Sequence, residues 1–548
     1  ADIPEALEQV VSKALEKDPD KRYQLLGELI EDLRSISEGI EPVGIKARLR
    51  RAKLVRRKRA ILYAVLTGSL IILAAILLAV FTGPAEALAS IAVLPLENRS
   101  GDPDQDIFVG GMHEDLITEL SKISDLDVTS RYSVMRFRGT ESSLPEIAKS
   151  LNVEAIVAGS AQQAGDRVRI SIQLIDVKTG QNLWADSFDE EYKNVLMLHR
   201  EMAQAIALKL GIALTPQEQE TLKATNIVNP EAHKAYLMGR HFRNQTNLES
   251  LKRSIDYYQQ SIDLDPQYAA PYAGLAMTYT TLTQLSGAVR HEEGWGKVRT
   301  LAEQAVELDE GLSDAHYALA ASYWAGDWDW ERAEEEFKLS LELNPNSSDA
   351  HVLYALFLGS LERHQEALAH VLKARELDPL NPWIGAEVGE ILWYANEYDQ
   401  AIEEVKKILE VYPNYTRGHS VLNIAYMMNG MDDEFFETDK KQVLYTGLTP
   451  EEKTVYDSIY AQNGLPALYI WIADKWEEMA KTTYVPPKRL AVQNTLAGRI
   501  DRAFEWLEKA YEVHSSHMMF VQVDHCFDAL RSDPRFDDLL RRVGFPEK

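Results

Sequence analysis

The sequence predicts a multidomain chain: a single transmembrane helix, an α/β domain, and then an all-α solenoid of helical repeats. Three observations predict this order. Residues 60–82 carry no charge, residues 90–212 alternate between strand and helix patterns, and prolines recur every 34 residues further along. With 548 residues, the chain is long enough for several folded domains rather than one core.

Composition narrows the classes of partner and cofactor. The net charge is -27, and the acidic residues lie mainly after residue 82, so that part of the chain would repel a nucleic acid. Cys526 is the only cysteine, which excludes an internal disulfide and any multi-cysteine metal site. We therefore expect no nucleic-acid partner, no cofactor and no metal ion.

Residues 60–82 are predicted to form the transmembrane helix. At 1.5 Å per residue the uncharged run reaches about 35 Å, enough to cross a hydrocarbon core of about 30 Å. Residues 37–59 form a basic juxtamembrane segment, with nine Lys or Arg between Lys46 and Arg59. The positive-inside rule places this segment in the cytoplasm, beside the lipid bilayer, and everything after residue 82 outside it. A cleaved signal peptide and a buried core helix are the alternatives.

Residues 1–36 contain two amphipathic helices separated at Pro19, and such a pair is expected to belong to a larger body. The run Lys13-Ala14-Leu15-Glu16-Lys17-Asp18-Pro19, followed by Lys21-Arg22-Tyr23-Gln24, resembles the end of the carboxy-terminal lobe of bacterial serine/threonine protein kinases. The resemblance gives Pro19 and Arg22 a structural role. A glycine-rich loop, a catalytic lysine and catalytic aspartates are missing, so we expect no catalytic residue and no kinase activity in this chain.

Residues 88–222 are predicted to form the α/β domain. Val168, Ile170, Ile172 and Leu174 alternate with polar residues, which is typical of a half-buried strand. Several short motifs resemble the TolB-like amino-terminal domain of bacterial signalling proteins: Ile91-Ala92-Val93-Leu94-Pro95-Leu96, Val157-Ala158-Gly159-Ser160, Arg167-Val168-Arg169-Ile170 and Trp184-Ala185. That resemblance implies an accessory or interaction role rather than a defined reaction.

Residues 229–445 are predicted to form helical repeats. Three prolines and three alanines recur every 34 residues, each alanine twelve positions before a proline: Pro345, Pro379, Pro413, Ala333, Ala367 and Ala401. This period identifies tetratricopeptide (TPR) repeats, in which each proline stops the second helix of a pair. Residues 446–548 are expected to form a divergent, TPR-like helical cap that covers the last repeat.

The repeat register predicts a concave binding face for a protein or peptide. Trp324 and Trp393 are its expected anchors, because aromatic residues carry much of the binding energy of interfaces. The alternative is that these aromatics fill the core between repeats. The residues predicted to line the face are Asp314, Tyr317, Trp324, Asp349, Val352, Leu356, Trp383, Glu390, Trp393, Arg417 and Met427.

The leading hypothesis is the membrane and sensor portion of a truncated bacterial receptor-type serine/threonine kinase. In that hypothesis the chain is a single-pass protein of the bacterial inner membrane, with a cytoplasmic amino terminus and periplasmic domains that bind a protein or peptide. A homodimer is left open as its assembly. The alternatives are a non-enzymatic envelope scaffold and a transcription regulator or cyclase-type signalling protein with the same modules.

Overall fold

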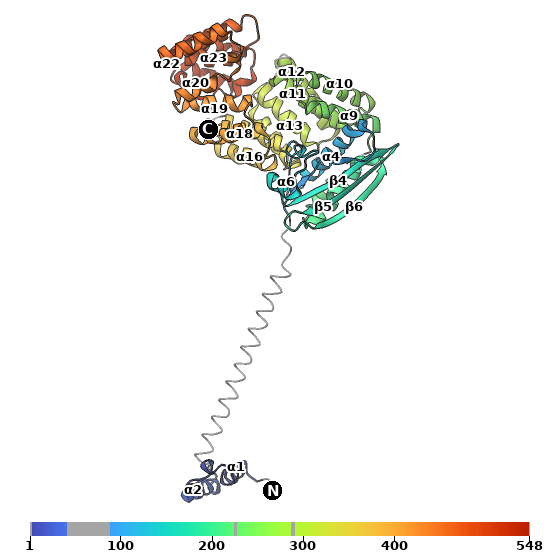
Figure 1. Ribbon diagram of the computed structural model, residues 1–548, viewed down its shortest axis with the longest axis vertical. Helices are drawn as coiled ribbons and strands as arrows, with labels where there is room; N and C mark the ends of the chain where they lie inside the picture. Colours follow the sequence, from blue (N-terminus) through green and yellow to red (C-terminus); the bar gives the residue numbers. More distant parts are fainter. Residues whose placement is uncertain (1–2, 41–87, 224–226, 286–290, 547–548) are drawn as a thin grey trace. The chain divides into compact units, whose positions relative to one another are not determined.

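The computed structural model describes residues 3–40, 88–223, 227–285 and 291–546. The chain divides into two compact units, residues 1–86 and residues 87–548 (Figure 1). The first unit contains α1 (Glu5–Ala14), η1 (Pro19–Lys21) and α2 (Leu26–Ser37). Arg22 donates from Nε to the carbonyl of Glu16 at 2.6 Å. Leu15 and Leu26 are both 74% exposed, so this helix pair leaves much of its apolar surface uncovered.

The predicted transmembrane helix, residues 60–82, lies outside the described residues. Within the ranges that the structure does describe, no helix is both long and apolar enough to cross a membrane. The predicted fold class, which counts a transmembrane helix among its elements, is therefore corrected. The fold is a mostly helical, TPR-like solenoid joined to a small mixed sheet (Figure 1).

The sheet has the strand order β3-β1-β4-β5-β6, and β2 also pairs with β4. Its strands are β1 (Ser90–Val93), β2 (Glu97–Asn98), β3 (Asp127–Val128), β4 (Ala155–Ala164), β5 (Arg167–Asp176) and β6 (Asn182–Glu191). The strand β1 runs parallel to β3 and β4, whereas β4, β5 and β6 form an antiparallel meander. In β5 the apolar positions are buried and Arg169 and Gln173 are exposed, as the alternation predicted.

Helices cover one face of this sheet. The helices α4 and α7 pack on each other, with α4 also contacting β1 and β4, and α7 contacting β6. A capping box between Ser143 and Glu146 starts α6 and satisfies the backbone at the helix end. The helical elements of this part are η2 (Pro103–Gln105), α4 (Asp106–Ser121), α5 (Arg131–Met135), α6 (Leu144–Leu151), η3 (Tyr192–Asn194), α7 (Val195–Leu210) and α8 (Pro216–Lys223).

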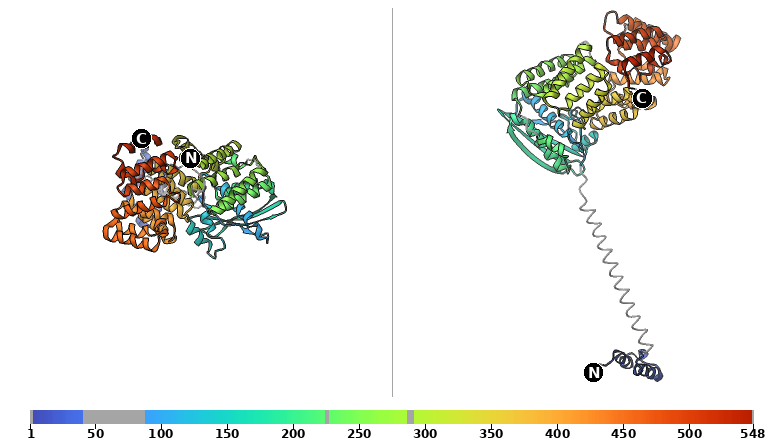
Figure 2. Two further views of the ribbon diagram at one scale, coloured as in Figure 1. Left: turned by 90° about the horizontal axis from the view of Figure 1, so that it is seen from above. Right: turned by 180° about the vertical axis from the view of Figure 1, so that it is seen from behind.

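The remaining helices form the repeat array, coloured from green to red in Figure 2. Ala333, Ala367 and Ala401 are fully buried where the two helices of a repeat meet. The array comprises α9 (Pro230–Arg243), α10 (Leu248–Leu264), α11 (Ala269–Leu285), α12 (His291–Leu308), α13 (Ser313–Ala321), the π-helical turn η4 (Ser322–Asp327), α14 (Trp330–Leu343), α15 (Ser348–Ser360), α16 (His364–Leu377), α17 (Pro382–Tyr394), α18 (Tyr398–Val411) and α19 (Thr416–Met428).

The carboxy-terminal part continues the array without a break in the core. One cluster of buried apolar residues runs from Ala276 to Val543. The elements are α20 (Asp432–Asp439), α21 (Val443–Gly447), α22 (Pro450–Met479), α23 (Pro487–Leu496), α24 (Ile500–Glu512), η5 (Ser516–Phe520), η6 (His525–Leu530) and α25 (Pro534–Val543). Gly464 has a non-helical backbone and bends α22.

The first array helix, α9, packs directly on α4 of the α/β domain. Leu237 of α9 is buried within the same apolar cluster as the sheet. A Cβ atom on Gly111 of α4 would lie 2.7 Å from Cδ1 of Leu237, so any larger residue at this helix contact would have to displace the Leu237 side chain. The α/β domain and the array therefore share one core at this contact.

We predict that Gly111→Ala destabilises the protein by about 1–3 kcal/mol, because the new methyl group overpacks the contact with Leu237. Gly110→Ala is the matched control in the same helix: its Cβ would meet nothing within 4 Å, and alanine favours a helix by about 0.5–1 kcal/mol. Urea unfolding of the two variants measures the difference. Equal effects would contradict the close packing of α4 on α9.

Candidate functional site

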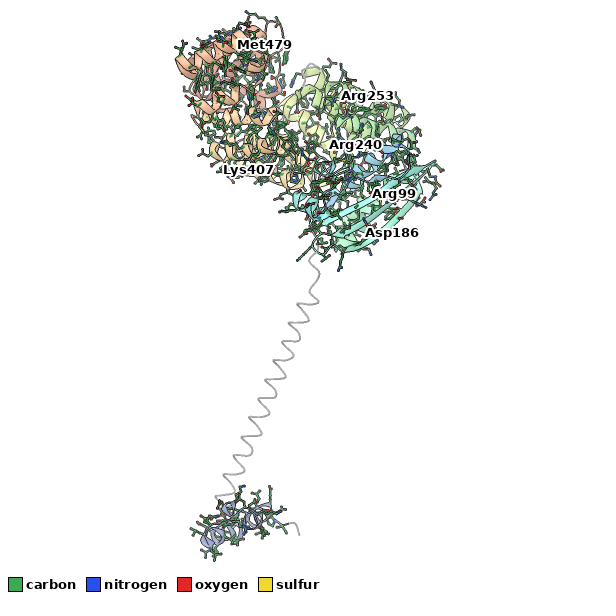
Figure 3. The ribbon with its side chains drawn as sticks, viewed as in Figure 1. Arg99, Asp186, Arg240, Arg253, Lys407 and Met479 are labelled. Carbon is green, nitrogen blue, oxygen red and sulfur yellow. The ribbon has the colours of Figure 1, made fainter. Side chains whose placement is uncertain are left out.

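A buried ion-pair cluster joins α4 to α9. Arg240 of α9 is 6% exposed and donates from Nη2 to Oδ1 of Asp115 at 2.8 Å and to the carbonyl of Gly111 at 3.0 Å (Figure 3). Its Nε lies 3.4 Å from Oε2 of Glu114. Burial alone would raise the pKa of Asp115, but the Arg240 guanidinium and the neighbouring His233 and His199 together hold that pKa below its usual range. The ionised form of Asp115 is therefore stabilised by contacts from α9.

Two buried histidines complete this cluster. Nε2 of His233 lies 3.4 Å from Oδ2 of Asp115, and its Nδ1 lies 3.0 Å from the hydroxyl of Tyr192. Nδ1 of His199 lies 3.9 Å from the same carboxylate, and burial lowers the pKa of His199 to about 4. Across the described residues, no group of three or more His, Cys, Asp or Glu could hold a metal ion. The arrangement suits a structural joint rather than a reaction.

The turns between successive repeats form a second set of contacts with the α/β domain. Asn346 donates from Nδ2 to the carbonyls of Ser121 and Ile123 at 3.0 and 3.1 Å. In the next turn, Oδ1 of Asp378 accepts bonds from the hydroxyl and backbone N–H of Ser133, at 2.5 and 3.1 Å.

The third turn repeats the pattern 34 residues later. The hydroxyl of Tyr412 donates to the carbonyl of Leu380 at 2.5 Å and accepts a bond from Arg136 of the α/β domain. The repeat period thus places a residue that makes polar contacts with the α/β domain at each of three consecutive turns.

A patch of three charged side chains and one tyrosine lies where α9 ends and α13 and α15 begin. The side chains of Asp314, Tyr317 and Asp349 make no hydrogen bond or ion pair within the part of the chain that the structure describes. Arg243, at the end of α9, donates to the sulfur of Met277 at 2.8 Å and has no ion pair to a described residue. We call these four residues, Arg243, Asp314, Tyr317 and Asp349, the charged patch.

The members of the charged patch affect one another's pKa values. Solvent reaches Asp349, yet the surrounding protein displaces enough water to raise its pKa to about 6. The positive charge of Arg243 opposes that shift, and the carboxylates of Asp378, Asp314 and Glu114 add to it. A carboxyl group whose pKa lies near neutral pH, beside a guanidinium that has no ion pair to a described residue, can bind a polar or charged group.

The residues predicted for the concave face fall into two groups. Solvent reaches six of them, at least in part: Asp314, Tyr317, Asp349, Trp383, Arg417 and Met427. The other five are buried: Trp324, Val352, Leu356, Glu390 and Trp393. Arg417 pairs with Glu390 and with Glu387, the latter at 3.2 Å from Nε to Oε1.

The two expected anchors pack against the chain's own carboxy-terminal segment. Trp324 is fully buried, with its ring centroid 5.5 Å from that of Phe520. Trp393 is 4% exposed, and its centroid lies 6.2 Å from the ring of His525. Sequence reasoning did not find Phe520 as a contact, because nothing local links it to residues almost two hundred positions earlier.

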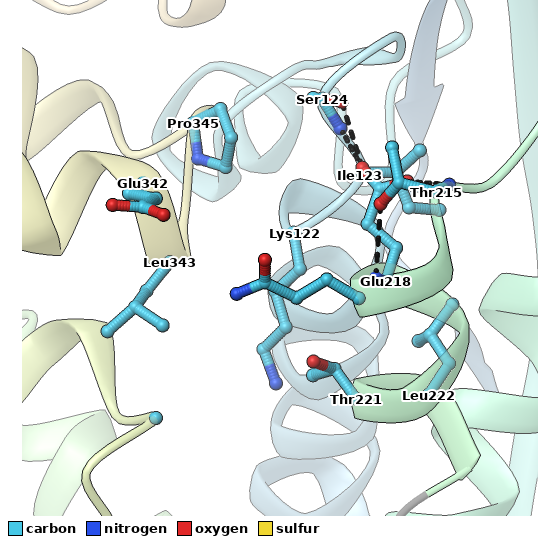
Figure 4. A pocket seen from close by; sticks show the side chains of 12 residues that line it. Lys122, Ile123, Ser124, Thr215, Glu218, Thr221, Leu222, Glu342, Leu343 and Pro345 are labelled. Atoms are coloured by element: carbon cyan, nitrogen blue, oxygen red, sulfur yellow. Dashed lines mark hydrogen bonds between the residues drawn. The ribbon is translucent and has the colours of Figure 1, made fainter.

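A pocket of about 190 Å³ also lies between the α/β domain and the array (Figure 4). Its walls include Lys122, Thr221 and Glu342. Glu218 accepts hydrogen bonds from the backbone of Ser124 at 2.8 Å and from the backbone of Thr215 at 2.7 Å. Burial works to raise the pKa of Glu218, but these hydrogen bonds lower it below its usual range. The carboxylate is thus already satisfied by the chain itself.

Comparison with known proteins gives partial matches. Residues 87–206 match the sequence family described as HilA/YgeH-like transcriptional regulator, second domain. A putative adenylate cyclase 3 of Rhizobium meliloti (strain 1021) is 33% identical over 236 residues, 43% of this chain and 40% of the relative. The transcriptional regulator HilA of Salmonella paratyphi A is 24% identical over 264 residues, 47% of this chain and 46% of the relative. The chain spans less than half the length of these curated relatives.

Among solved structures, a thermophilic TPR protein of Thermus thermophilus is similar over 36% of this chain and 99% of its own, with 16% identity and a TM-score of 0.31. The sequence matches, together with the helical repeats, support a regulatory or signalling protein of TPR type. They are consistent with the prediction that this chain is not a kinase.

These findings leave two finer predictions unsupported and correct a third. The matched family on residues 87–206 is a regulator domain, so the TolB-like assignment of that region is not supported. The matches to regulators and to a putative cyclase do not support a kinase origin. The predicted inner-membrane, single-pass location is corrected, because no described helix could span a membrane and the reported curated relatives are a transcriptional regulator and a putative adenylate cyclase.

We predict that Arg240→Ala destabilises the protein by about 3–5 kcal/mol, because it leaves the carboxylate of Asp115 buried without its partner. Arg253→Ala is the matched control. Arg253 is exposed and stacks over Phe242 at 3.8 Å, so its loss should cost less than about 1 kcal/mol. Chemical unfolding measures both values, and a similar cost for the two variants would contradict a buried joint.

We also predict that the protein loses stability as the pH falls from about 6.5 to about 4. Burial lowers the pKa of His113 and of His199 to about 4, so the unfolded chain binds protons over this range and the folded protein does not. Each histidine contributes roughly 3 kcal/mol to this loss near pH 4. Asp349 and Asp439, whose pKa values are raised to about 6 because the surrounding protein displaces water, act in the opposite direction.

The variant His199→Leu isolates one histidine from these opposing groups. Its free energy of unfolding, measured against pH, should fall less steeply than that of the original protein between about pH 6.5 and about pH 4. An unchanged slope would show that His199 is already protonated in the folded protein.

Proposed function

We propose that residues 88–548 form the partner-binding module of a regulatory protein of the transcription-regulator or cyclase class, and that the charged patch binds a peptide segment of a protein partner. The observation that carries the proposal is the set of unpaired charges at Arg243, Asp314 and Asp349. The matches to a transcriptional regulator and a putative adenylate cyclase favour these classes over a receptor kinase.

Charged groups that have no ion pair in the fold are available to pair with a ligand. A carboxylate that has lost part of its water and gained no hydrogen bond destabilises the protein unless something else compensates. Asp314 and Asp349 lie on neighbouring helix pairs and present two acceptors, and Arg243 presents donors from a third helix. A peptide that brings a basic side chain and a carbonyl or carboxylate would satisfy all three.

Neighbouring accessible residues extend the site along the array. Trp383 and Met427 are half-buried and offer apolar contact, and Arg417 offers a further cation beside Glu387. Trp324 and Trp393 support these helices from within through their contacts with Phe520 and His525. The proposed domain limits are residues 88–222 for the α/β part, 229–445 for the repeats and 446–548 for the cap.

We predict that short random peptides displayed on phage and selected on the full chain will be enriched in Lys and Arg. Resynthesised peptides should bind the double variant Asp314→Asn/Asp349→Asn at least about tenfold more weakly, because charged hydrogen bonds are worth about 1.5–3 kcal/mol. Fluorescence anisotropy measures the dissociation constants. Binding should also weaken from about pH 7.5 to about pH 5 as Asp349 is protonated.

The matched control is Glu335→Gln/Glu410→Gln, which removes two exposed carboxylates from the second helices of repeats. It should leave peptide affinity unchanged. Peptides that bind the two double variants equally would contradict the charged patch as the site, and a failure to select any peptide would contradict peptide binding itself.

A further inference from the structure

We propose that the outer edge of β6 is a second docking surface, which adds an extended segment of a partner protein whose residues alternate between apolar and basic. The proposal is independent of the charged patch. It rests on three observations: the difference between the two edges of the sheet, the pattern of side chains on β6, and the charge of that strand.

The two edges of the sheet differ sharply. At one edge β3 has only two residues, and the array covers it: Lys373 pairs with Asp127 at 2.6 Å, and the backbone N–H of Ser130 donates to the carbonyl of Leu377 at 2.8 Å. At the other edge β6 has ten residues and pairs with β5 alone among the described strands. A strand of this length with one unpaired side is a template for strand addition.

One face of β6 alternates between aromatic and acidic side chains. Trp184, Asp186, Phe188 and Glu190 occupy every second position, after a register shift that ends before Trp184. The rings of Trp184 and Phe188 are half-buried, with centroids 6.2 Å apart. A strand added beside β6 would place its own alternating residues next to these four, so apolar residues would meet the rings and basic residues the carboxylates.

Neither acid on this face forms an ion pair with another described residue. Asp186, labelled beside the β6 edge of the sheet in Figure 3, accepts a bond from the neighbouring backbone N–H of Ser187 at 2.8 Å. Glu190 receives only a 3.4 Å contact from Nδ2 of Asn194. In contrast, Asp189 on the opposite face is held by both Arg167 and Arg169.

The same charges argue against a second copy of this chain as the occupant. No Lys or Arg lies within Asn182–Glu191, so two β6 strands side by side would bring carboxylates together. Charged residues on an edge strand discourage self-pairing and apolar strands. A basic, alternating strand meets neither obstacle.

The test uses the full chain and a probe peptide that alternates valine and lysine. Two further peptides serve as comparisons: one has the same composition with its lysines and valines in separate blocks, and the other alternates valine and glutamate. We expect the alternating valine–lysine peptide to bind at least about tenfold more tightly than either, by fluorescence anisotropy. Amide hydrogen exchange of β6 should slow when it binds.

The variant Asp186→Lys/Glu190→Lys should weaken binding of the probe by about tenfold or more. Its matched control is Glu141→Lys/Glu220→Lys, which makes the same change in net charge at exposed sites away from β6. This variant should keep its affinity for the probe within about twofold. Circular dichroism shows that each variant is folded.

The proposal would be overturned if the two variants weakened binding of the probe equally, or if the block peptide bound as tightly as the alternating one. Net charge alone would then explain the interaction. Slowed exchange confined to other strands would also overturn the proposal. Self-association of the full chain that Asp186→Lys/Glu190→Lys abolishes would show that the occupant is a second copy.

Discussion

The Arg240–Asp115 ion pair is the interaction on which the arrangement of the molecule depends. It is buried between α4 and α9, and Glu114, His199 and His233 are grouped around it. A buried pair is weak support for stability as such, because desolvation offsets most of the attraction, but breaking it leaves an uncompensated charge. The pair therefore specifies where the α/β domain sits on the array more than it adds to the total stability.

The repeat period then fixes the remaining geometry. Successive turns at Asn346, Asp378 and Tyr412 each reach the α/β domain, because a 34-residue unit returns the chain to the same side of the array. The charged patch is a consequence of the same arrangement: Arg243 lies three residues after Arg240, at the end of the helix that the ion pair holds in place.

The local features of the fold could be predicted from the sequence. The buried Val168 and Ile170 follow a period of two, the buried Ala333 and Ala367 follow a period of 34, and the capping box of Ser143 and Glu146 joins residues only three positions apart. Each of these depends on residues close in the sequence, or on a pattern that repeats without change. Contacts between residues far apart in the sequence show no such pattern.

The contacts that decide the site belong to that second class. Arg240 meets Asp115 across 125 residues, and Trp324 meets Phe520 from the far end of the chain, so neither could be inferred from spacing. The concave-face residues were placed by repeat register alone, and register does not reveal what packs over them. Trp324 was for that reason expected as an anchor of that face, with the core between repeats as the alternative, and the structure buries it completely.

Calorimetry tests most directly whether the joint between α4 and α9 couples the α/β domain to the repeats. If the shared core and the Arg240–Asp115 pair couple the two parts, the sheet and the repeats of residues 88–445 unfold in a single transition, seen together by calorimetry and by the circular dichroism of helix and sheet. Two separate transitions, with the sheet lost at a different temperature from the repeats, would contradict that coupling.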